Sequence, residues 1–161
     1  MKTVLKFRVV LAALLMTMFL NSYAQQSADV KATMERIVKK HDGSKGVSCM
    51  TVAKGSGLEL LKVMLNREFG KEFMKGVTSV TLLDYSKASQ EICMALHNDI
   101  NSFTSLLQEF DLSKEEQFSG YDHIRCFASE SEDGTLSDFI IALEDAKTKM
   151  LVYMVGKIKV E

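Results

Sequence analysis

The sequence predicts an α+β domain, a two-layer sandwich in which helices cover one face of a mixed sheet of about five strands. Up to about residue 110, apolar residues recur mainly at the three- and four-residue spacing of amphipathic helices. After Ser119-Gly120 the spacing changes to two, which is typical of half-buried strands. Helices that precede a closing antiparallel meander are typical of the α+β class.

Residues 1–24 have the pattern of a secretory signal peptide. Lys2, Lys6 and Arg8 form a basic start, and an uncharged run from Val9 to Leu20 follows. Ser22-Tyr23-Ala24 then places small residues where signal peptidase cuts. The run is too short to span a bilayer, which needs about 20 apolar residues. We therefore expect an exported protein, periplasmic or extracellular, with one mature domain at residues 25–161.

The composition of the mature chain excludes several classes of protein. Without the leader, 17 basic residues stand against 21 acidic ones, a net charge of −4, so binding to nucleic acid is not expected. A chain of 137 residues can bury about two thirds of its unfolded surface, enough for a core of its own. The mature sequence contains no further apolar stretch that could span a membrane.

Three segments have helical spacing of apolar residues. The first runs from Asp29 to His41 and is ended by Gly43, and the second runs from Leu58 to Phe69 with an uneven continuation to Phe73. The third is longer. Its apolar residues keep the spacing from Ala88 to Phe110, with a kink expected near residues 98–102.

Five segments have the alternation or β-branched content of strands, and two short turns join the last three. The expected strands are Val47–Lys54, Val77–Tyr85, Asp122–Ser129, Leu136–Asp145 and Met150–Val160. Asp133-Gly134 suits the first tight turn because such turns require positive φ, and residues 146–149 form the second. The first two strands could pair in parallel through a right-handed helical crossover.

The closing segment Leu151-Val152-Tyr153-Met154-Val155-Gly156-Lys157-Ile158, taken with the leader and the small α+β domain, resembles a known group of proteins. These are the small exported Bacteroidetes proteins of domain-of-unknown-function family 4252. The resemblance would cover most of residues 27–160. It implies an extracytoplasmic protein without an assigned activity, and it supplies no catalytic residues.

Cys49 and Cys126 alternate with apolar neighbours on their strands, and Cys93 lies on the apolar side of the third predicted helix, which favours a role for all three as small core residues. Export would also permit a disulfide between Cys49 and Cys126, leaving one thiol over. A cysteine nucleophile with His97 or His123 as its base is a third reading, but no C-x-x-C motif supports it.

The sequence predicts no metal site and no cofactor. The histidines His41, His97 and His123 have no partner at the spacing of a zinc site. Glu130, Glu132 and Asp133 lack the spacing of a calcium loop and are expected at a hairpin tip. Methionine and cysteine could bind Cu(I), but the methionines fit the apolar pattern better as core residues.

One face of the meander is the predicted interaction surface. Alternation places Ile124, Cys126 and Ala128 on one side of their strand, and the residues between them on the other. If helices cover only one face of the sheet, the opposite face exposes aromatic and cationic side chains, a combination common in protein interfaces. The predicted surface consists of His123, Arg125, Phe127, Tyr153 and Lys157.

The functional expectation is therefore a non-enzymatic module of the bacterial envelope. It would bind another envelope or secreted protein, or a second copy of itself, through the surface described above. The alternative is a small-ligand binder or an enzyme that uses a pocket between the helices and the sheet, with Cys or His as the reactive group.

Overall fold

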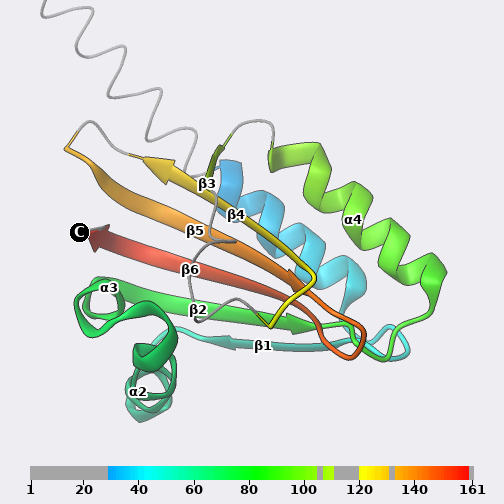
Figure 1. The fold of residues 1–161 in the computed structure, drawn as a ribbon, viewed down its shortest axis with the longest axis horizontal. Helices are drawn as coiled ribbons and strands as arrows, with labels where there is room; N and C mark the ends of the chain where they lie inside the picture. The colour runs from blue at the N-terminus through cyan, green and yellow to red at the C-terminus, as the bar shows by residue number, and fades with distance from the viewer. Residues whose placement is uncertain (1–28, 105–106, 111–119, 131–132, 160–161) are drawn as a thin grey trace, which may run out of the picture.

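A computed structural model describes residues 29–104, 107–110, 120–130 and 133–159 of the chain (Figure 1). The predicted leader and part of the predicted hairpin tip, including Glu132, lie outside these residues. The α+β class is confirmed: helices are layered on an open antiparallel sheet (Figure 1).

Six strands form the sheet in the order β1-β2-β6-β5-β4-β3. Each neighbouring pair is antiparallel. The strands are β1 (Ser48–Val52), β2 (Val77–Asp84), β3 (Gln108–Phe110), β4 (His123–Glu130), β5 (Thr135–Glu144) and β6 (Lys149–Lys159). The predicted meander is thus present as β4, β5 and β6, joined by the two expected turns.

The expected parallel pairing of the first two strands is wrong, and the sheet is not mixed. The register pairs Val52, at the end of β1, with Val80 near the start of β2. Two helices connect these strands, α2 (Ser56–Phe69) and α3 (Lys71–Lys75), and Gly70 at φ +85° separates them. Because the chain turns at Gly70, β2 begins at the end of the sheet where β1 ends, and the two strands pair antiparallel. One continuous crossover helix would instead have carried the chain back to the end where β1 begins.

A layer of two helices covers one face of the sheet. The first helix spans residues 29–41, as predicted, and the second is α4 (Gln90–Thr104). Their apolar sides pack on the same buried cluster of the sheet, which includes Phe127, Ile140 and Tyr153. Lys40 and His41 at the end of the first helix both contact Asp99 of α4, so the two helices lie side by side.

The opposite face is also partly covered, by α2 and α3 (Figure 1). Leu58 and Leu61 of α2 and Met74 of α3 pack on Val80, Ile141 and Met154. The rings of Phe69 and Phe73 lie edge-on to Phe139, with centroids 6.4 and 4.9 Å apart from it. The sheet therefore has apolar residues on both faces, and neither face is left open as a whole.

The third helix ends earlier than its apolar spacing predicts. It stops at Thr104, and Gln108–Phe110 forms the edge strand β3, paired with β4. Phe110 packs with the cluster under α2 and α3, whereas Leu96 and Ile100 of α4 pack on the opposite face. A helix running straight on from α4 would not place Phe110 on that other face.

The backbones at the end of α3 and in β6 approach each other closely at two glycines, Gly76 and Gly156. A Cβ atom on Gly156 would lie 2.1 Å from the carbonyl oxygen of Gly76, and one on Gly76 would lie 2.0 Å from that of Lys157. Only glycine allows this contact between the end of α3 and β6.

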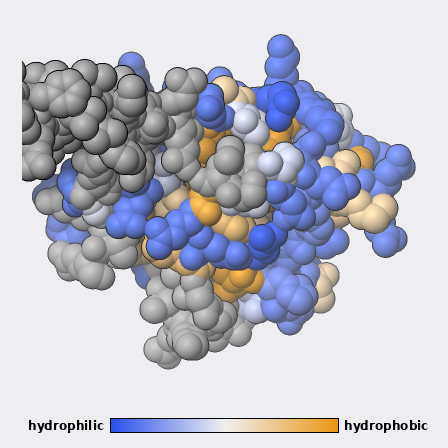
Figure 2. Space-filling view, turned by 90° about the horizontal axis from the view of Figure 1, so that it is seen from above, coloured by the Kyte–Doolittle hydropathy of each residue, from blue (hydrophilic) through white to orange (hydrophobic). Residues whose placement is uncertain are grey.

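Seen from above in Figure 2, the surface shows apolar residues set between polar ones. Among the described residues no helix has the length and apolar character of a membrane span.

Candidate functional site

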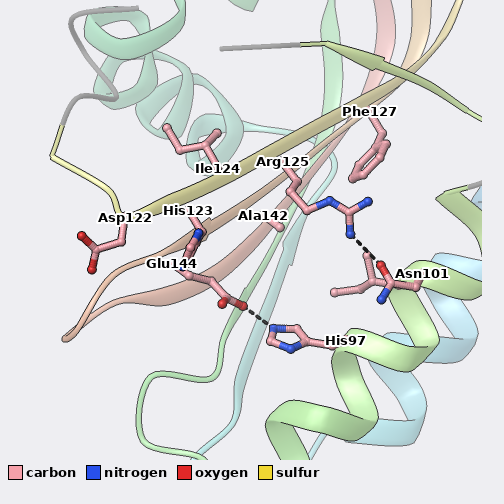
Figure 3. A pocket seen from close by; sticks show the side chains of 10 residues that line it. His97, Asn101, Asp122, His123, Ile124, Arg125, Phe127, Ala142 and Glu144 are labelled. Carbon is pink, nitrogen blue, oxygen red and sulfur yellow. Dashed lines mark hydrogen bonds and ion pairs between the residues drawn. The ribbon is translucent and has the colours of Figure 1, made fainter. Parts of the chain in front are cut away.

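A cavity of about 420 Å³ lies between α4 and the part of the sheet where β4 begins and β5 ends (Figure 3). This volume is within the range of small-molecule sites. The cavity is lined from α4, β4, β5 and the residue before β4. The lining residues are His97, Ile100, Asn101, Asp122, His123, Ile124, Arg125, Phe127, Ala142 and Glu144.

Alternation and register explain why these side chains meet. His123, Arg125 and Phe127 are every second residue of β4 and share the face under α4. The register places Glu144 directly opposite His123. On α4, His97 and Asn101 are four residues apart and so lie on one side of the helix.

A hydrogen-bonded group of three side chains lies at one wall of the cavity, and two of them, His97 and Glu144, line it. The Tyr85 hydroxyl donates to Glu144 Oε1 at 2.8 Å, and His97 Nε2 contacts the same oxygen. The Tyr85 ring is also edge-on to the His97 imidazole, with centroids 6.2 Å apart. These contacts hold His97 in one orientation at the cavity wall (Figure 3).

The carboxyl of Glu144 is held in its charged form. Burial acts to raise its pKa, but hydrogen bonds from His97 and Tyr85 and the nearby charge of Lys149 outweigh burial, so the pKa is lowered. The pKa of Tyr85 is raised, first by burial and then by its hydrogen bond to Glu144. At neutral pH, Tyr85 is therefore a neutral donor to an ionised carboxylate.

Arg125 is the cationic side chain in the middle of the cavity. Its Nη1 donates to Asn101 Oδ1 at 2.6 Å, and its guanidinium carbon lies 4.8 Å from the centre of the Phe127 ring. Its Nε makes a longer contact, 3.4 Å, with the exposed carboxylate of Glu109. Within the described residues, Nη2 has no hydrogen-bond partner.

The remaining lining gives the cavity an apolar floor beside this cation. Phe127 and Ile100 are buried, and Ala142 lies next to them. The carboxylate of Asp122 points away from Arg125 in Figure 3. The arrangement can therefore hold a molecule with an anionic end at Arg125 and an apolar body over Phe127.

The predicted interaction surface does not exist as one exposed patch. Phe127 is only 2% exposed and Tyr153 only 4%, because the first helix and α4 cover this face of the sheet. The alternation was predicted correctly, but the assumption that helices cover only the other face was wrong. His123, Arg125 and Phe127 are instead brought together in the cavity.

The other two residues of the predicted surface lie elsewhere. Tyr153 lines a separate groove, of about 620 Å³, between the first helix and strands β1, β2 and β6. Its hydroxyl donates to the buried Asp138 at 2.6 Å. Lys157 is exposed on β6 next to the close contact with Gly76, outside both hollows.

The disulfide between Cys49 and Cys126, which export would permit, is not present in the structure. All three cysteines are free thiols. Cys49 lies on β1 and Cys126 on β4, and with four strand-to-strand steps between them their Cα atoms are about 19 Å apart. A disulfide needs Cα atoms within about 7 Å. Their side chains also pack on opposite faces of the sheet.

Neither Cys49 nor Cys126 lies beside His97 or His123 in the structure, so the nucleophile and base of the cysteine-enzyme hypothesis do not come together. Burial, and then the nearby charge of Glu109, raise the pKa of the Cys126 thiol to about 12, and Cys126 faces away from His97 and His123. Cys49 lies at the β1 edge, far across the sheet from His123 on β4. The described residues also hold no cluster of three or more His, Cys, Asp or Glu side chains suited to a metal ion.

Sequence reasoning missed Glu144, Tyr85 and Asn101 as site residues. Glu144 ends a strand whose other charged residue is buried, and Tyr85 directly follows the end of β2. Both could have been suspected as polar residues at strand ends. Their convergence on His97 depends on how α4 lies across the sheet, which the sequence pattern does not specify.

Comparisons with known proteins give no relative for this arrangement. No protein-family model, no curated protein and no solved structure matches the chain.

Proposed function

We propose that this protein is a non-enzymatic binding module that holds a small organic anion in the cavity under α4. The observation that carries the proposal is the position of Arg125. Asn101 and Phe127 hold its guanidinium at the cavity wall, and no described residue accepts a hydrogen bond from Nη2. A guanidinium held in this way can donate to a carboxylate or phosphate group without first being ordered.

The surroundings of Arg125 support an anion rather than a cation. Glu144, an acidic side chain on this wall, already accepts a hydrogen bond from Tyr85 and contacts His97, and the carboxylate of Asp122 points away from Arg125 (Figure 3). His123 adds an imidazole whose ring N–H can donate to an anion. The apolar floor formed by Ile100, Phe127 and Ala142 favours an organic anion over an inorganic one.

The predicted export of the protein gives this function its setting. With residues 1–24 removed as a leader, the domain would meet its ligand in the periplasm or outside the cell. A partner protein of the envelope, the other class of function expected from the sequence, would have to use a surface other than the buried Phe127 and Tyr153.

The proposal is tested by calorimetric titration with a matched pair of probes. Benzoate offers a carboxylate on an aromatic ring, and benzamide has nearly the same shape without the charge. We expect benzoate to bind and benzamide to bind at least about tenfold more weakly, since a charge-assisted hydrogen bond is lost. Hexanoate, titrated in parallel, tests whether an aliphatic chain can replace the aromatic ring. Phenyl phosphate tests whether a phosphate can replace the carboxylate.

Two variants complete the experiment. Arg125→Gln should abolish benzoate binding, whereas Lys157→Gln removes an exposed cation outside the cavity and should leave it unchanged. Circular dichroism spectra confirm that both variants fold. If no anion of the set binds, or if Arg125→Gln binds benzoate as well as the unmodified protein does, the proposal is wrong.

A further inference from the structure

The outer face of α2 carries an exposed apolar stripe that the fold does not use. Leu60, Val63 and Met64 are 64%, 66% and 65% exposed, and they lie three and four residues apart on one side of the helix. The opposite side of α2, with Leu58, Leu61 and Leu65, packs on the sheet. Thus α2 is apolar on two sides, and only one of them is covered by the part of the chain that the structure describes.

Such a helix is unusual on the surface of a monomer. A surface helix ordinarily has charged and polar residues opposite its buried side. Here three large apolar side chains take those positions, and neighbouring exposed apolar groups mark interaction sites. The stripe is far from the cavity proposed above, because α2 covers the other face of the sheet.

The charges that border the stripe suggest what covers it. Glu59 and Arg67, both exposed, lie four residues before and four residues after Val63. If two copies of α2 pack antiparallel around a two-fold axis at Val63, Glu59 of each copy comes beside Arg67 of the other. The stripe is therefore complementary to itself in both apolar contact and charge, as a two-fold interface requires.

We propose that α2 is a self-association surface, and that it packs antiparallel against α2 of a second copy of this chain. Leu60, Val63 and Met64 form the apolar centre, and two Glu59–Arg67 ion pairs fix the register. The exposed contact of Glu59 with Lys62 on its own helix, at 3.4 Å, is long and can be exchanged for the contact between copies.

The size of the surface sets the expected strength. A helix of 14 residues is about 21 Å long, so the contact is smaller than a standard protein interface. We therefore expect a reversible dimer with a dissociation constant in the range of about 10 μM to 1 mM.

Sedimentation velocity of the purified protein, from about 5 μM to 1 mM, tests this proposal. The unmodified protein should shift from monomer to dimer over this range. Val63→Glu places two like charges at the two-fold axis and should leave a monomer at every concentration. Lys75→Glu, an exposed change on α3, is the matched control and should dimerise normally.

A charge exchange tests the register itself. Glu59→Lys and Arg67→Glu each replace two attractive pairs with repulsive ones. Loss of the two attractive pairs alone should weaken the dimer by about 2- to 30-fold, and the repulsion should weaken it further. The double variant restores opposite charges and should dimerise like the unmodified protein. A monomer at all concentrations, a dimer insensitive to Val63→Glu, or a double variant that stays monomeric would each overturn the proposal. If the protein stays monomeric at all concentrations, the stripe would have to bind a different partner.

Discussion

His41 Nε2 lies 2.8 Å from Asp99 Oδ2, and this contact joins the end of the first helix to the middle of α4. His41 is only 5% exposed. Lys40 Nζ reaches both oxygens of the same carboxylate, at 2.9 and 2.8 Å. The two helices that cover one face of the sheet are thus linked through Asp99, and one of them, α4, lines the cavity.

Replacing Asp99 with Asn should therefore destabilise the fold by about 1–3 kcal/mol, because a buried imidazole loses its charged partner. Urea unfolding of both proteins at pH 7 measures this difference. Asp42→Asn, at an exposed position just after the first helix, is the control for loss of a carboxylate. An Asp99→Asn variant as stable as the unmodified protein would show that the link contributes nothing.

The same carboxylate makes stability depend on pH. Burial acts to raise the pKa of Asp99, but hydrogen bonds from Lys40 and His41 outweigh it, so the pKa is lowered in the folded state. A lowered pKa means that the contribution is complete above the unfolded value of about 3.9 and is lost as pH falls through the folded value. The stability gap between the unmodified protein and Asp99→Asn should accordingly narrow below about pH 4.

Phe127 supports the fold as well as the cavity. It is buried beneath the helical roof, so Phe127→Ala should cost about 3–5 kcal/mol of stability, with Tyr153→Ala in the same range. The sequence-based surface hypothesis requires the opposite, namely that both variants fold normally and lose only a partner. Thermal unfolding decides between them, and Phe127→Leu should be affected less because it retains most of the buried volume.

The thiols should remain reduced and mostly unreactive in the folded protein. Cys93 and Cys126 are buried, while Cys49 is half-buried and its pKa is raised by burial and by the charge of Asp42. Iodoacetamide at pH 8 should modify Cys49 alone, and slowly, whereas all three cysteines should react in urea. Mass spectrometry of the alkylated protein counts the adducts. A peptide linking Cys49 to Cys126 would contradict the strand order.

The leader is tested by the start of the exported chain. Expressed in a bacterial host with an intact export pathway, the protein recovered outside the cytoplasm should begin at Gln25. Amino-terminal sequencing provides the measurement, and Ala24→Leu, which places a large residue at the cut, should block processing. A chain that keeps Met1 in the exported fraction would contradict the prediction.

Much of the fold follows from short-range pattern. The alternation along β4 and β6 and the glycine stop after His41 predicted the meander and the first helix to within a few residues. The spacing of Leu107 and Phe110 fits a helix as well as it fits a loop and edge strand, so the end of α4 was misplaced. The antiparallel pairing of β1 with β2 depends on the turn at Gly70, where one residue with positive φ divides what the pattern shows as one uneven helix.

The candidate site was predictable only in part. His123, Arg125 and Phe127 were correctly placed on one face of one strand, since side chains alternate along β4. Whether that face is exposed to solvent or covered by a helix depends on how the helices pack on the sheet, which no local sequence pattern specifies. Asn101 and Glu144 reach Arg125 and His97 through contacts over 24 and 47 residues of chain, which spacing rules do not describe.

The most direct test of the account is a map of backbone amide shifts by nuclear magnetic resonance during titration with benzoate. We expect the shifts to concentrate at His97–Asn101 of α4 and His123–Phe127 of β4, and to disappear in Arg125→Gln. Shifts concentrated at Thr51 and Thr81 in the groove beside the first helix, or no shifts at all, would contradict the assignment of the cavity under α4 as the binding site.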